Sequence, residues 1–214
     1  KPILGCEIYV APRSRFEKSP AGGGRKPYYH LLLLAENRVG FQNLIKLSSR
    51  GYLEGFYYRP RVDKELLAAH SEGIICASAC LAGEVPTLLR HEDYDGARKA
   101  ALEHLEIFGE HNYFLELQDH GIPEQETVNR GLVELSTELG VPLIATNDCH
   151  FLTSDDHSAH DVLICIGTGK KRDDEKKMTY QVDHYFKSID EMAERFGEHP
   201  EALAHTFEIA ERCN

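Results

Sequence analysis

The sequence lacks the features that mark membrane and secreted proteins. Its 214 residues contain no run of about 18 apolar residues, and residues 1–4 do not resemble a secretory signal. The six cysteines lie in apolar segments and include no Cys-x-x-Cys pair, which is typical of reduced thiols in the cytoplasm. We therefore expect a cytoplasmic protein with no membrane partner.

Positive charge is also scarce. The chain has 24 lysines and arginines against 35 acidic residues, a formal net charge of -11, which is the wrong sign for coating nucleic acid. A phosphate substrate would need local positive charge, which bound metal ions can supply. Twelve histidines are candidate ligands. The three glycines at 22–24 do not predict a phosphate cradle, because no helix start follows them, and we expect residues 11–27 to form a flexible basic loop.

Short apolar segments alternate with amphipathic helices along most of the chain. This alternation predicts an α/β fold with parallel strands, and the number of units favours a barrel. One predicted helix is capped by Asn37 and ends at Gly51. Its expected buried face consists of Val39, Phe41, Leu44, Ile45 and Leu47. We expect strands at 3–10, 28–35, 73–80, 113–117 and 142–147.

The apolar segment 142–147 is followed by polar side chains. Ligands in α/β folds bind beyond the carboxyl ends of parallel strands, so Asp148 and His150 could face one point there. On this segment alone, a helix-capping Asp with a surface His explains the pattern equally well.

Three other candidate ligands lie in or after earlier strands. Glu7 interrupts an apolar strand, and a buried carboxylate has to be ion-paired, protonated or bound to a metal. Taken singly, Glu7 is better explained as a structural ion pair, His30 as a core histidine and Cys80 as a small apolar residue. Together with Asp148 and His150, however, they supply the oxygen, nitrogen and sulfur ligands that suit zinc or a mixed divalent cluster.

Residues 51–61 combine four aromatic side chains with Arg59 and Arg61. Aromatic residues beside arginine can stack on single-stranded bases. Their dense clustering favours instead a loop that packs on its own scaffold.

Several motifs resemble one family, the polymerase and histidinol phosphatase (PHP) domain at the N-terminus of the bacterial replicative DNA polymerase III alpha subunit. They are GCEIYV at 5–10, YHL at 29–31, GYLEGFYY at 51–58, SACLAGE at 78–84, ELQDHG at 116–121, TNDCH at 146–150 and AERCN at 210–214. The resemblance runs over essentially the whole chain, and the tyrosine-rich motif distinguishes the alpha subunit from free-standing phosphatases.

The resemblance implies a distorted (β/α)7 TIM-like barrel with a trinuclear metal site. The family's ligands fall on Glu7, His30, Cys80, Asp148 and His150, of which Asp148, His150 and Glu7 are expected to be catalytic. Zinc is the expected metal, with manganese or magnesium as alternatives. The family's first strands, with an H-x-H motif, are absent because the chain starts just before the Glu7 strand. We expect a truncated barrel over 1–187 and a helical connector toward a polymerase palm domain over 188–214.

The implied function is that of a fragment of a DNA polymerase, a nucleotidyltransferase, whose complete PHP domain acts as a metal-dependent 3′→5′ exonuclease. The fragment alone is expected to be inactive. Implied partners are a DNA 3′ end and other replicase subunits, including a proofreading exonuclease subunit. Two alternatives remain: a non-catalytic scaffold, braced by metals, that docks the proofreading subunit, and a stand-alone phosphomonoesterase.

Overall fold

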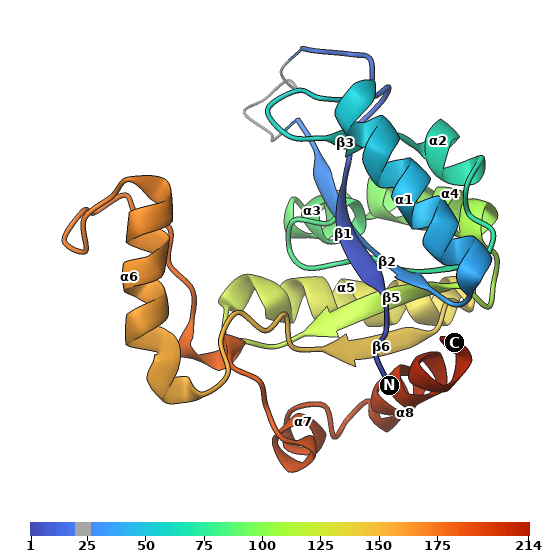
Figure 1. Cartoon of the computed structure of the whole chain (residues 1–214). Coiled ribbons are helices and arrows are strands. Elements are labelled where there is room, and N and C mark those ends of the chain that lie inside the picture. The colour runs from blue at the N-terminus through green and yellow to red at the C-terminus, as the bar shows by residue number, and fades with distance from the viewer. Residues whose placement is uncertain (20–26) are drawn as a thin grey trace.

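The computed structural model describes residues 1–19 and 27–214 and contains one six-stranded sheet with helices around it (Figure 1). Within the described residues the strand order is β3-β1-β2-β4-β5-β6. The strands are β1 Gly5–Val10, β2 Tyr29–Ala35, β3 Arg61–Val62, β4 Ile74–Ala77, β5 Tyr113–Gln118 and β6 Leu143–Thr146. The sequence predicts five of them to within a few residues, and the two-residue β3 was missed.

The expectation that all strands are parallel was wrong for β2. This strand pairs antiparallel with β1 and with β4, whereas β1 with β3, β4 with β5 and β5 with β6 are parallel pairs. The start of β2 therefore lies at the same edge of the sheet as the carboxyl ends of the other strands. Tyr29, in the first position of β2, pairs with Val10, in the last position of β1.

The helices start mostly where capping residues predict. The side chain of Asn37 accepts hydrogen bonds from the first turn of α1, and Asp63, Asp93 and Ser188 cap α2, α4 and α7 in the same way. The main helices are α1 Arg38–Leu53, α2 Lys64–Ala68, α3 Glu84–Arg90, α4 Tyr94–Phe108, α5 Pro123–Leu139, α6 His157–Thr168, α7 Ile189–Arg195 and α8 Pro200–Arg212.

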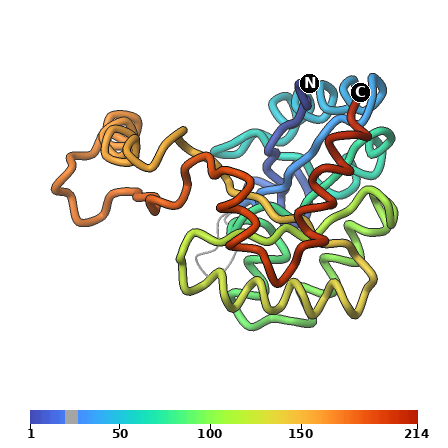
Figure 2. The backbone as a smooth tube through the Cα atoms, turned by 90° about the horizontal axis from the view of Figure 1, so that it is seen from below, coloured from blue at the N-terminus to red at the C-terminus, as the bar shows by residue number. Residues whose placement is uncertain are grey.

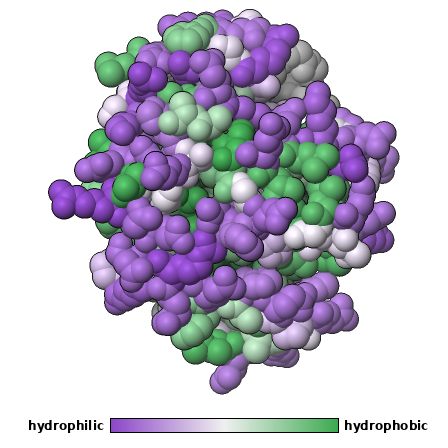
Figure 3. Space-filling model, turned by 90° about the vertical axis from the view of Figure 1, so that its right-hand side faces the viewer, coloured by the Kyte–Doolittle hydropathy of each residue, from purple (hydrophilic) through white to green (hydrophobic). Residues whose placement is uncertain are grey.

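Helix α1 differs from its prediction in two respects. It does not end at Gly51 but continues to Leu53, because Gly51 is buried beside the backbone of Arg61, where the helix passes close to β3. Its expected apolar face is also only partly buried. Leu44 and Leu47 pack in the core, whereas Val39, Phe41 and Ile45 are exposed. Apolar patches are visible on the otherwise mostly hydrophilic right-hand side of the molecule (Figure 3).

The main core lies between one face of the sheet and helices α1 to α5. Ile8, Leu31 and Leu33 of the first two strands belong to it. A smaller cluster on Ile75, Ala77, Phe114 and Ile144 also includes Ile209 of α8. Helix α8 packs along β6, and its His205 Nδ1 lies 2.7 Å from the carbonyl oxygen of Leu143. The boundary between residues 187 and 188 stays a prediction.

The chain ends and the segment around α6 lie at different sides of the molecule. The two termini are neighbours, and Lys1 Nζ donates to the Glu211 carbonyl at 3.1 Å, whereas α6 projects away from the sheet (Figures 1 and 2). Within residues 1–19 and 27–214, β3 and β6 are the two edge strands of the sheet, and no pairing between them closes it into a barrel. Residues 20–26 of the predicted basic loop lie outside the described part of the chain. Nowhere in that part is a helix both long and apolar enough to span a membrane.

Candidate metal centre

A cavity of about 1100 Å³ lies at the sheet edge where the start of β2 meets the carboxyl ends of its neighbours. All five side chains proposed from the sequence line this cavity: Glu7, His30, Cys80, Asp148 and His150. They divide into two groups whose ligand atoms lie within 4.8 Å of one another inside each group.

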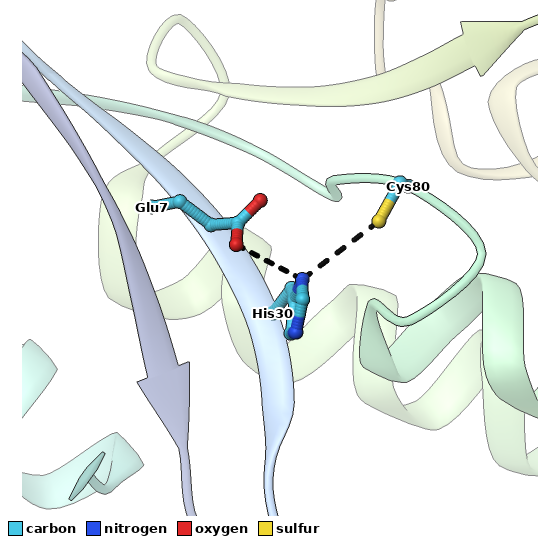
Figure 4. A group of neighbouring side chains, drawn as sticks. All are labelled: Glu7, His30 and Cys80. Atoms are coloured by element: carbon cyan, nitrogen blue, oxygen red, sulfur yellow. Dashed lines mark hydrogen bonds and ion pairs between the residues drawn. The ribbon is translucent and has the colours of Figure 1, made fainter. Parts of the chain in front are cut away.

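The first group consists of Glu7, His30 and Cys80 (Figure 4). His30 Nδ1 lies 3.0 Å from a Glu7 carboxylate oxygen and 3.8 Å from Cys80 Sγ. In the antiparallel pairing of β1 with β2, Tyr9 lies opposite His30. Alternate residues of a strand face the same side of the sheet, so Glu7, two residues before Tyr9, lies on the same face as His30. The reversed direction of β2 thus brings a histidine at the start of a strand to the ends of its neighbours.

Glu7 is not the buried carboxylate that its apolar surroundings in the sequence suggest. Its side chain is 44% exposed, because its face of the strand borders the cavity. A carboxylate that borders a solvent-filled cavity keeps part of its hydration, so Glu7 does not need the buried ion pair that its sequence surroundings favour.

Cys80 lies in the loop between β4 and α3, which is fixed at both sides. The Ala79 N–H donates to the buried carboxylate of Glu116 at 3.1 Å, and the His30 N–H donates to the Ala82 carbonyl at 3.0 Å. Burial raises the pKa of Cys80 to about 12, and the nearby charges of Asp148 and Glu7 also raise it. Without a cation the sulfur is therefore a thiol, while a bound cation would favour the thiolate.

The second group consists of Asp148, His150 and His184. His150 Nε2 lies 3.5 Å from an Asp148 carboxylate oxygen. Burial tends to raise the pKa of Asp148, but the hydrogen bond and charge of His150, with smaller effects of His184 and His120, hold it below its usual value. Asp148 has a positive φ of 40°, which is uncommon for a residue with a side chain and indicates a tightly constrained turn after β6.

His184 was missed by the sequence analysis. Its Nδ1 lies 3.1 Å from the Asp148 carbonyl, so this nitrogen carries the proton and Nε2 keeps a lone pair. Burial, with the neighbouring His120 second, lowers its pKa to about 4, which leaves the ring neutral near pH 7. His184 ends a short 3-10 turn, Val182–His184, far along the chain from His150, and no spacing pattern links the two.

A hydrogen-bonded frame holds the second group. The ring of His120 stacks on that of His184 at 3.7 Å, and its nitrogens contact Gln125 at 2.8 Å and the Asn147 carbonyl at 2.8 Å. The His150 N–H donates to the His184 carbonyl at 2.8 Å. The backbone at Asp148 and His150 is thus tied to the segment that contains His184.

The donor atoms fit a site for divalent cations. The two groups combine carboxylate oxygens, imidazole nitrogens and one sulfur, a set that suits zinc better than magnesium or calcium, which prefer oxygen alone. The two groups line the same cavity, and the charges of Asp148 and Glu7, from different groups, both raise the pKa of Cys80.

The sequence model of the PHP domain matches residues 1–120. The chain is also 49% identical over 215 residues to the DNA polymerase III subunit alpha of Treponema pallidum, 48% identical to that of Borreliella burgdorferi and 40% identical to that of Thermus aquaticus. Each comparison covers 100% of this chain but only 18% to 19% of the relative. Because the family match spans more than half of the residues, the chain belongs to the PHP domain family.

Proposed function

We propose that this chain is a metal-dependent phosphoesterase domain that hydrolyses the phosphodiester bond at a DNA 3′ end. We also propose that it is the PHP domain of the alpha subunit of a bacterial replicative DNA polymerase. The main support is the meeting of five predicted ligands, from separate strands and loops, at one cavity.

Glu7, His30 and Cys80 would hold one part of the metal cluster, and Asp148 and His150 the other, with zinc as the preferred ion. When bound, such ions lower the pKa of coordinated water and stabilise charge on phosphoryl oxygens. The thiol of Cys80 adds the soft ligand that favours zinc over manganese or magnesium. The remaining ligands of a trinuclear site, and closure of a (β/α)7 barrel, would come from residues other than these five.

The chain's own side chains fix the orientation of the catalytic groups. Tyr180 packs its ring 4.0 Å from that of His150, and His150 Nε2 faces the Asp148 carboxylate. His184 holds the Asp148 backbone through its Nδ1–H. This arrangement supports roles for Asp148 and Glu7 as oxygen ligands and for His150 as a nitrogen ligand beside the reacting phosphate.

The similarity to alpha subunits about five times longer supports the proposal that this domain belongs to a larger DNA-synthesising chain. Its partners would be a DNA 3′ end and other replicase subunits. The polymerase reaction would use carboxylates elsewhere in that longer chain.

A second proposed function is a scaffold that docks another replicase subunit, such as a separate proofreading exonuclease. The exposed apolar side chains of the projecting α6 favour it, because Leu163 and Ile166 are 62% and 73% exposed. Retained ligands argue against a purely structural role.

The test is 3′-end cleavage by the full-length polypeptide that contains this domain, with Asp148→Asn and His150→Ala as variants. We expect both to reduce cleavage of a mismatched 3′ end by at least about 100-fold, with primer extension largely preserved. Asp155→Asn and His111→Ala are matched controls, because both side chains are exposed and lie outside the cavity. Cleavage at the wild-type rate by either cavity variant would refute the catalytic assignment.

A further inference from the structure

We propose that Arg59 and Arg90 form a phosphate subsite in the cavity, which binds phosphates of a DNA strand on the 5′ side of the bond that is cut. The subsite would select a single-stranded polynucleotide over a small phosphate ester. This inference rests on the proposed phosphodiesterase function and adds the residues that recognise the substrate.

Arg59 and Arg90 supply positive charge to the cavity wall. Among the described residues that line the cavity, Arg59 and Arg90 are the two arginines, and no lysine lines it. Across residues 1–19 and 27–214, neither guanidinium has an ion pair or a hydrogen bond. By contrast, Arg15 is paired with Asp63 at 2.8 Å, and Arg61 donates to backbone carbonyls. Within the described residues, the guanidinium donors of Arg59 and Arg90 are thus unused and available to a ligand.

Arg59 lies in a loop whose backbone is held by the buried Arg61. The loop that contains Arg59 leads into β3, which pairs with β1. In this pairing Arg61 lies opposite Tyr9, and Tyr9 is two residues beyond Glu7 on β1. The buried guanidinium of Arg61 donates to the Gly55 carbonyl at 3.1 Å and to the Glu17 carbonyl at 2.8 Å. A Cβ at Gly55 would lie 1.8 Å from the Arg61 carbonyl, so the loop closes only around glycine. Arg59 is therefore held beside the strand that contains Glu7.

Arg90 reaches the cavity from a different element. It is the last residue of α3, the helix that follows the Cys80 loop. Val85 and Leu89 of this helix are buried in the core, and Thr87 Oγ1 donates to the Leu81 carbonyl at 3.1 Å. Arg90 and Cys80 thus flank one packed segment, which fixes Arg90 relative to the candidate ligands.

The size of the cavity and the net charge of the chain also favour a polynucleotide subsite at these arginines. Pockets for small ligands measure about 300–1,000 Å³, and this cavity of about 1100 Å³ lies at the upper end of that range, with room for more than one nucleotide. With a formal net charge of -11, the protein repels a polyanion everywhere except at local positive groups. Guanidinium forks match phosphate oxygens bidentately. A phosphomonoester has no second phosphate for such groups, so the subsite would discriminate against it.

The test uses the full-length polypeptide loaded with zinc or manganese, with Arg59→Ala, Arg90→Ala and the double variant. Arg130→Ala is the matched control, since this exposed arginine lies outside the cavity and has no ion pair among the described residues. Binding of a fluorescent single-stranded hexanucleotide is measured over a range of salt concentrations. Cleavage is compared between the hexanucleotide and a dinucleoside monophosphate, which has only the scissile phosphate.

We expect each cavity variant to weaken hexanucleotide binding by about tenfold and to lower the slope of log affinity against log salt by about 0.7. Arg59→Lys and Arg90→Lys should restore the slope because they keep the charge. The loss of kcat/KM should be greater for the hexanucleotide than for the dinucleotide.

Two outcomes would overturn the subsite: a salt slope equal to that of Arg130→Ala, or equal losses on both substrates. If Arg90 only complemented the dipole of α3, its alanine variant would lower stability and leave the slope unchanged. A wild-type protein that binds with the expected slope but cleaves neither substrate would refute the phosphodiesterase function and leave the subsite supported.

Discussion

Lys187→Met should loosen the turn that presents Asp148. The Lys187 side chain is only 1% exposed, and its Nζ donates to Asn147 Oδ1 at 3.0 Å and to the Asp183 carbonyl. Methionine keeps most of the stem but removes the donor, so the buried Asn147 oxygen loses this partner. An unsatisfied buried acceptor costs about 1–3 kcal/mol, and we expect a loss of about 2 kcal/mol in the free energy of unfolding.

A double-mutant cycle with Asn147→Ala isolates this contact. Urea unfolding of the wild type, both single variants and the double variant should give a coupling energy of about 1–2 kcal/mol, since the two residues touch directly. Lys176→Met is the control, because Lys176 is exposed on a loop. Metal content after dialysis should also fall in Lys187→Met. A coupling near zero together with unchanged metal content would refute the idea that Lys187 holds the metal-binding turn.

Three further predictions follow from the site and its surroundings. Cys80→Ser should reduce the retention of zinc after dialysis more than the retention of manganese, because a hydroxyl replaces the soft thiolate. If the variant retained both metals equally well, Cys80 would be a core-packing residue and not a ligand. Burial tends to raise the pKa of Glu84, but His104 at 3.2 Å and Lys64 at 2.7 Å hold it below 4.5. The pKa of Glu84 is therefore lower in the folded protein than in the unfolded chain, and ionised Glu84 stabilises the fold at any pH above its pKa in the unfolded chain. This stabilisation is lost as the pH falls toward and through the lower pKa of the folded protein. Glu84→Gln should flatten the loss of stability as the pH falls below about 5, and an unchanged acid-unfolding curve would contradict this. His184→Ala should lower metal content even though His184 is outside the family's ligand set, whereas Gln125→Ala, whose side chain hydrogen-bonds to His120 and to none of the candidate ligands among the described residues, should lower it less.

Local signals predicted the start of α1 and the five candidate ligands that line the cavity. Asn37 could be identified as a cap because capping depends on a side chain and the next few N–H groups. The strand-end position of Asp148 and His150 likewise follows from a local apolar run that ends in polar residues.

The rest depends on contacts between distant segments. The direction of β2 is set by pairing with β1 and β4, which no periodicity of its own sequence encodes, and it decides how His30 meets Glu7. His184 joins the site through the docking of residues 184–186 on 148–151. Ile45 follows a helical spacing but lies at 51% exposure, because the contact surface of α1 is narrower than its apolar face.

The central claim is that these side chains hold catalytic metal ions, and the most direct measurement is elemental analysis of the purified full-length polypeptide beside its 3′-end cleavage rate. We predict stoichiometric bound zinc, lost together with cleavage in Asp148→Asn and in His30→Ala, and restored activity when metal is returned to chelated wild-type protein. A wild-type protein that contains no bound metal after purification in the presence of zinc, or that cleaves equally well after chelation, would contradict the account.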